Sequence, residues 1–187
     1  MFLRGRPASQ PVFALVAVLM TLGACTPTFN WREVPLTDSG LVALLPCKPD
    51  RATRALPLGA DSVQVEMAGC EAGGATFAIA HAGAADAGQA EAWLKAWRTA
   101  TRTQLAEMEL EETAATLPRA ATSPAPLQLE ARGGGSSDGV RRGTPARVLW
   151  FAQRERSGGV SLYQATVLGQ PSSSEAIPAF FEGLRLP

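Results

Sequence analysis

The pattern of apolar and polar residues divides the chain into segments with two different periods. Strict alternation over residues 63–67 places Val63, Val65 and Met67 on one face, as in a half-buried β-strand. The runs 146–155 and 160–168 flank a Ser-Gly-Gly turn and predict a β-hairpin. Other short apolar or alternating runs predict further strands at 41–45, 52–58, 76–81 and 127–132. Short turns join 41–45, 52–58, 63–67 and 76–81 into a predicted four-stranded meander.

Helical periodicity appears in two places. Between residues 86 and 112 apolar side chains recur at spacings of three and four, which predicts one long helix whose apolar stripe faces the sheet. Asp86 with Gln89 three residues later resembles a capping box at its start. A short closing helix is predicted from N-cap candidates at serines 172–174 to a glycine at position 183. The stripe of the long helix consists of Ala90, Leu94, Trp97, Thr101, Leu105 and Met108.

The order of strands, long helix, strands and short helix predicts an α+β domain. We expect an antiparallel β-sheet covered by one long central helix and a short C-terminal helix. The strand at 41–45 ending in Pro46, the segment Gly143-Thr144-Pro145 and the ending at 180–186 resemble the PsbP-like and DcrB-like α/β/α sandwich proteins. The resemblance implies a small non-catalytic module that binds partners, often as a lipoprotein. It transfers no catalytic residue to this chain.

The N-terminal 25 residues have the anatomy of an export signal. Arg4 and Arg6 precede an apolar run over 12–24, which is shorter than the roughly 20 residues that a membrane-spanning helix needs. The segment Leu22-Gly23-Ala24-Cys25 resembles the end of a bacterial lipoprotein signal. That resemblance implies cleavage before Cys25 and acylation of this residue, although an uncleaved transmembrane segment remains the alternative.

These features predict three parts of the chain: a signal peptide over 1–24, a tether over 25–40 and one globular domain over 41–187. Because Thr26 follows the cysteine where family members kept in the inner membrane usually have aspartate, we expect the outer membrane, with the protein facing the periplasm. The inner membrane is the alternative. Two or three acyl chains on Cys25 would hold the protein to the membrane firmly.

Charge and cysteine content exclude some classes of function. The 17 basic and 17 acidic side chains are interspersed, and loss of Arg4 and Arg6 with the signal takes the net charge from 0 to −2. Nucleic-acid-binding domains carry a strong basic bias, so we expect no nucleic-acid partner. After acylation of Cys25, Cys47 and Cys70 remain, and in an exported protein this pair predicts a disulfide. Free thiols or a metal site are the alternatives; no cofactor is predicted.

His81 is the single histidine, so any histidine-based acid–base chemistry would depend on it. A hydrolase would need a serine and a carboxylate that converge on His81, but Ser157 and Ser161 flank hairpin glycines rather than forming a Gly-x-Ser-x-Gly elbow. A mixed metal site of His81 with carboxylates stays open. The glycine-rich stretch 133–139 is followed by more loop and a strand, which favours a hairpin loop over a phosphate-binding loop.

Aromatic residues supply the remaining binding candidates. Trp93 lies at the edge of the helical stripe, and Trp150 and Phe151 point to opposite faces of their strand, so one of them reaches the second face of the sheet. With Tyr163 they form a candidate interaction surface. We therefore expect first a non-catalytic module that binds an envelope protein, second a carrier of a small apolar or lipid ligand, and third a hydrolase using His81.

Overall fold

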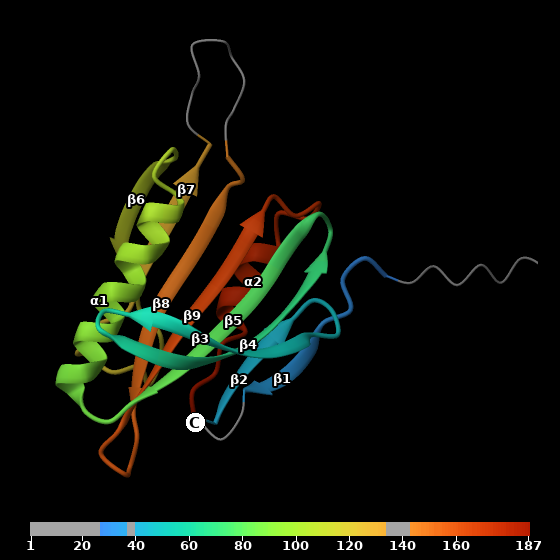
Figure 1. Cartoon of the computed structure of the whole chain (residues 1–187). Coiled ribbons are helices and arrows are strands. Elements are labelled where there is room, and N and C mark those ends of the chain that lie inside the picture. Colours follow the sequence, from blue (N-terminus) through green and yellow to red (C-terminus); the bar gives the residue numbers. More distant parts are fainter. Residues whose placement is uncertain (1–26, 37–39, 134–142) are drawn as a thin grey trace, which may run out of the picture.

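The computed structural model describes residues 27–36, 40–133 and 143–187 (Figure 1). The predicted signal peptide, Cys25 and most of the glycine-rich loop lie outside these ranges. The fold is α+β and sheet-dominated, with a seven-stranded antiparallel sheet in the order β3-β4-β5-β9-β8-β7-β6. Its strands are β3 (Asp50–Leu58), β4 (Asp61–Ala72), β5 (Ala75–Ala84), β6 (Glu109–Ala114), β7 (Leu127–Arg132), β8 (Ala146–Arg154) and β9 (Val160–Gly169).

Two helices and a β-hairpin cover the two faces of this sheet. The helix α1 (Ala87–Gln104) lies on one face, and α2 (Ala176–Glu182) lies on the other (Figure 1). The strands β1 (Arg32–Leu36) and β2 (Leu41–Leu45) form a separate antiparallel hairpin. The side chains of this hairpin belong to the same buried cluster as those of α2, so both cover the face opposite α1. We call the two sides of the sheet the α1 face and the α2 face.

The α1 face is built around tryptophans. Trp93, Leu94 and Trp97 of α1 pack in one buried cluster with Trp150 of β8 and Leu162 of β9. Asp86 caps the helix by accepting a hydrogen bond from the backbone N–H of Gln89, as the capping-box pattern predicts.

On the α2 face, alternate residues of the same strands pack against the hairpin and α2. Phe77 of β5, Phe151 of β8 and Tyr163 of β9 are fully buried there with Phe180 of α2. Phe77 and Phe180 meet edge to face, with ring centroids 5.6 Å apart. Gly183 ends α2 with a φ of −79°, so the left-handed region is not what requires glycine there. The reason is close packing, because a Cβ at Gly183 would lie 2.3 Å from that of Leu44.

Four predictions about the elements need correction. The long helix ends at Gln104 instead of 112, because residues 109–114 pair with β7 as strand β6. The tether contains β1, whose Val34 and Leu36 are buried against the α2 face. The predicted meander has three strands, β3-β4-β5, because β2 pairs with β1 instead. The closing helix begins after Glu175, which caps it without a side-chain hydrogen bond.

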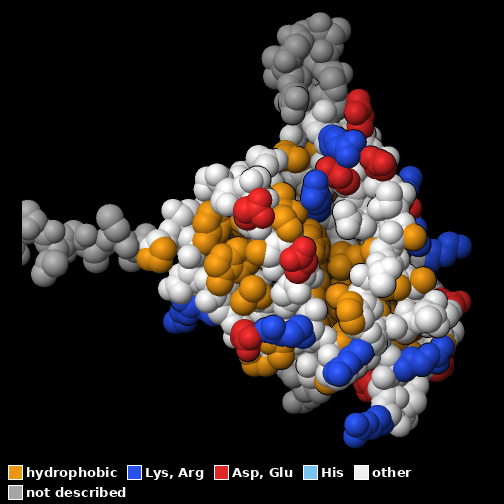
Figure 2. Space-filling view, turned by 180° about the vertical axis from the view of Figure 1, so that it is seen from behind, with side chains coloured by type: hydrophobic (Ala, Val, Ile, Leu, Met, Phe, Trp, Pro, Cys, Tyr) orange, Lys and Arg blue, Asp and Glu red, His pale blue; other side chains and the backbone are white. Residues whose placement is uncertain are grey.

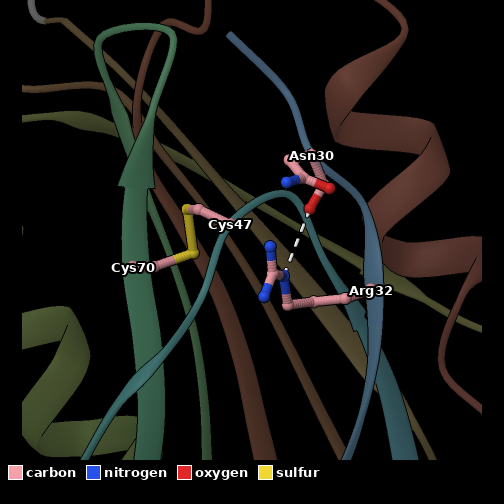
Figure 3. The surroundings of a disulfide bond; sticks show 4 residues. All are labelled: Asn30, Arg32, Cys47 and Cys70. Carbon is pink, nitrogen blue, oxygen red and sulfur yellow. Dashed lines mark hydrogen bonds between the residues drawn. A yellow bond between two sulfur atoms is a disulfide. The ribbon is translucent and has the colours of Figure 1, made fainter. Parts of the chain in front are cut away.

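On the α2 face, a disulfide joins the β1–β2 hairpin to the main sheet. Cys47 follows β2, Cys70 lies in β4, and their sulfur atoms are bonded across a Cα–Cα distance of 5.9 Å (Figure 3). The predicted pairing of these two cysteines is therefore present in the structure. It fixes the β1–β2 hairpin to the main sheet and should contribute on the order of 3 kcal/mol to stability for a loop of this length.

Candidate functional site

The structure surrounds His81 with the residue types that a triad would require. His81 Nε2 lies 3.1 Å from the hydroxyl of Ser161, and Nδ1 lies 3.6 Å from a carboxylate oxygen of Glu66. The Ser161 hydroxyl also donates to Glu155, at 2.6 Å. The imidazole ring rests on Tyr163, with ring centroids 5.2 Å apart. No local sequence pattern signals this cluster, because its members come from β4, β5, β9 and the β8–β9 turn.

The hydrogen bonds assign the protons within the His81 cluster. Ser161 has a single hydroxyl proton, and it points to Glu155, so Nε2 of His81 must donate to the Ser161 oxygen. Burial lowers the pKa of His81 below its ordinary value, although the carboxylates of Glu66 and Glu155 oppose this shift. The histidine is therefore neutral at pH 7, and it holds a proton on the nitrogen that a general base would need free.

Nucleophilic chemistry at Ser161 meets two further obstacles. The residue is 1% exposed, so a substrate carbonyl has no direct approach to its oxygen. It also lies within β9, paired with β5 on one side and β8 on the other, so the backbone N–H groups around it are used in the sheet. These backbone N–H groups are therefore not free to stabilise an oxyanion. The His81 cluster suits a hydrogen-bonded link between strands better than a hydrolytic site.

The four aromatic side chains that were predicted to form an interaction surface are buried in the structure, so that prediction needs correction. Trp150, Phe151 and Tyr163 are completely buried, and Trp93 is 9% exposed. Phe151 and Tyr163 stack at a centroid distance of 4.9 Å inside the α2 face, and the indole N–H of Trp150 donates to Gln164 at 2.8 Å. Trp93 donates to Asp61 at 2.7 Å and so ties α1 to the start of β4. These side chains form the core of the two faces, because both faces of the central strands are covered.

A hollow on the α2 face is a candidate binding site formed by described residues. It has a volume of about 730 Å³, within the roughly 300–1,000 Å³ typical of small-molecule sites. It lies between α2 and the loop that follows β6, over the sheet residues Gln128 and Leu149. We call this hollow the α2 groove. Figure 2 shows the α2 face, where hydrophobic side chains gather around hollowed surface. Its lining comprises residues 114–119, Gln128, Leu149, Phe181, Glu182 and residues 184–186.

A second hollow of about 420 Å³ adjoins the α2 groove toward the N-terminus of α2. The floors are neighbours, because the pair Gln128 and Leu149 is followed two residues along by the pair Glu130 and Arg147. Glu130 accepts from Arg132 at 3.0 Å and from Arg147 at 3.2 Å. Burial alone would raise the pKa of Glu130, but these arginines outweigh it and hold the pKa below its usual range. The second hollow is therefore lined by charged side chains that form ion pairs with one another.

The α2 groove differs from that charged hollow. Its walls include Leu117, Leu149 and Leu184, and its charged side chains are the cations Arg119 and Arg185 and the exposed carboxylate Glu182. Arg185 forms an ion pair with Glu33 of β1. Arg119 donates to the backbone carbonyl of Leu186 at 3.4 Å and makes no ion pair with any carboxylate that the structure describes. The groove thus combines apolar walls with one cation that is available to an anion.

Sequence reasoning missed the α2 groove because its walls come from three distant segments. The stretch from Leu117 to Pro126 reads only as a Pro/Ala/Thr connection, and Phe181 reads as part of an apolar helix face. A proline at 118 was the one available signal, since it marks a turn that could present its next residue. Within the described ranges, no three His, Cys, Asp or Glu side chains are placed to hold a metal ion.

Comparison with known proteins gives no family for this chain. It matches no protein-family model and no curated protein sequence. Among the helices that the structure describes, none is long and apolar enough to cross a membrane.

Proposed function

We propose that this protein is a lipid-anchored, non-catalytic binding protein of the bacterial envelope and that the α2 groove is its binding site. The groove carries this proposal, because it combines a volume suited to a ligand with apolar walls and a cation, Arg119, that forms no ion pair with the described carboxylates. The anchor is the acylated Cys25, and the protein faces the periplasm from the outer membrane. The layering of helix, sheet and opposite helix supports kinship with the PsbP-like and DcrB-like sandwiches, with the β1–β2 hairpin as an addition.

Of the two non-catalytic hypotheses, the groove favours a carrier of a small apolar or lipid ligand. Binding of an envelope protein is the second candidate, and one observation favours it. Strand β6 is an edge of the main sheet, and its Glu109, Glu111 and Thr113 are exposed. Edge strands offer unpaired backbone groups to an added strand, so a partner could bind there without using the groove.

Cross-linking from defined positions in intact cells tests the site. A photoreactive amino acid replaces Thr116, an exposed residue of the groove lining, and in a matched control it replaces Lys95 on the exposed side of α1. We expect a defined adduct from position 116 and none from position 95. A third variant at Glu111 reports on the β6 edge. Equal labelling at positions 116 and 95, or adducts at 95 alone, would contradict the groove as the binding site.

The lipid anchor has its own test. Replacing Cys25 by serine should leave an uncleaved precursor without acyl groups, and intact-mass spectrometry of membrane and soluble fractions measures both changes. A wild-type protein with no acyl mass and the same processing as the variant would contradict the anchor while leaving the groove untouched.

A further inference from the structure

The turn beside the α2 groove holds an arginine where glycine would fit with less strain. The backbone N–H of Ala120 donates to the carbonyl of Leu117 at 3.2 Å, which closes a four-residue turn with Pro118 in its second position. Arg119 follows with a φ of +66°. A turn with proline second and positive φ third is the type II pattern, which favours glycine at the third position. Among the described residues, Arg119 is the one non-glycine residue with positive φ.

The side chain of Arg119 gives a reason to keep this strained residue. Arg119 lines the α2 groove, and its guanidinium donates one hydrogen bond, to the carbonyl of Leu186, another lining residue. The other arginines along α2 are compensated, since Arg185 pairs with Glu33 and Arg147 pairs with Glu130. An arginine presents five N–H donors, so most of those on Arg119 remain for a ligand. Strain at a ligand-facing residue is a recognised mark of function.

The floor of the groove indicates what kind of ligand accompanies the anion. Gln128 lies in β7 and Leu149 in β8, and each of these strands is paired on both sides. An extended peptide gains affinity from main-chain hydrogen bonds, which such interior strands do not offer. An alkyl chain needs none. Leu117, Phe181 and Leu184 supply apolar walls against which it can lie.

We propose that the α2 groove binds an amphiphile with one alkyl chain and one anionic head group, and that Arg119 binds the head group. This inference rests on the proposed function, because it names the ligand class of the same site. The alkyl chain packs between α2 and the loop 115–119, and the guanidinium of Arg119 donates hydrogen bonds to the anionic oxygens.

Dodecanoate and dodecanol serve as probes with the same chain length and different head groups. Isothermal titration calorimetry on the purified protein should show that the wild type binds dodecanoate about 10- to 100-fold more tightly than dodecanol, as expected for hydrogen bonds to a charged group. Arg119→Gln should lose this preference, and Arg119→Lys should keep part of it. Arg54→Gln, on the exposed edge strand β3, is the matched control and should bind as the wild type does.

Thermal unfolding of Arg119→Gly separates a ligand role from a structural one. Glycine relieves the positive φ, so we expect this variant to melt at a higher temperature than the wild type while losing preference for dodecanoate. A lower melting temperature with unchanged dodecanoate affinity would overturn the proposal and leave Arg119 as a support for the C-terminal segment. Equal affinity of the wild type for both probes would also overturn it. Cross-links from position 116 without dodecanoate binding would overturn the ligand class alone, and the groove would stand as the binding site.

Discussion

The two faces of the main sheet solve the same packing problem in different ways. The α1 face is covered by one helix whose Trp93 and Trp97 fill the space above the sheet. The α2 face is covered by a β-hairpin and a helix of seven residues, which together leave the floor beside β8 open. A single long element closes a face, whereas two short ones leave a seam. The difference shows why a binding groove occurs on the α2 face although both faces have complete aromatic cores.

The largest expected effects test whether the two cores are equally essential. Trp150 serves the α1 face and Phe151, its neighbour in β8, serves the α2 face, and both are fully buried. Replacing either by alanine should lower the free energy of unfolding by about 3–5 kcal/mol through lost burial and the cavity left behind. Urea denaturation monitored by circular dichroism measures both. A loss under about 1 kcal/mol for one variant would show that its face is only loosely packed.

The disulfide is specific to the α2 face, so its removal tests the hairpin layer alone. The double change Cys47→Ala and Cys70→Ala should lower the free energy of unfolding by on the order of 3 kcal/mol, because the unfolded chain regains freedom. Hydrogen exchange should report faster exchange in β1 and β2 than in α1. Uniform acceleration over both faces would mean that the hairpin layer and the sheet unfold as one unit.

A matched pair of leucines sharpens the comparison between a closed face and a groove. Leu129 of β7 is buried on the α1 face, whereas Leu149 of β8 lies 5% exposed under the α2 groove. Leu129→Ala should cost about 3–5 kcal/mol, and Leu149→Ala should fall near 2 kcal/mol, because a space open to the groove leaves no sealed cavity. Chemical denaturation of both variants measures the difference. Equal costs would indicate that the groove floor is packed as tightly as the α1 face.

The smallest expected effect is a pH dependence at the margin of the α2 face. Because the pKa of His81 is lowered in the folded state, the unfolded chain takes up a proton first as the pH falls below the ordinary value of 6.5. Acidification from pH 7.5 to 5.5 should therefore reduce the free energy of unfolding more for the wild type than for His81→Gln. A larger loss in His81→Gln would reverse the assigned sign.

Local pattern was sufficient for elements whose partners are near in sequence. The β8–β9 hairpin follows from alternation on either side of a glycine turn, and α1 begins where the Asp86 cap places it. The predicted end of α1 was wrong, because Leu105 and Met108 continue the helical spacing by coincidence although the helix ends at Gln104. Pairing of Glu109–Ala114 with β7 then prevails over that spacing. Strand β1 was missed because Pro27 precedes it and Pro35 lies within it, and prolines weaken the sequence signal for a strand.

The candidate sites could not be predicted in the same way. The cysteine pair followed from chemistry and count, but the α2 groove needs Leu117, Leu149 and Phe181 to meet across the fold. The aromatic surface failed for a related reason. Alternation correctly placed Trp150 and Phe151 on opposite faces, but it could not show that a hairpin from the predicted tether covers the second face.

The position of β5 in the sheet has a consequence for how the chain folds. The strands β3-β4-β5 form one local meander and β6-β7-β8-β9 form another, and the pairing of Ala75–Ala84 with Val160–Gly169 joins the two. That pairing closes a loop of more than 70 residues, so among the strand pairings of the main sheet it has the greatest entropic cost. We therefore expect the two meanders to form early and their union to limit the folding rate. Until β9 pairs with β5, the two meanders remain separate and β5 is an unprotected edge strand.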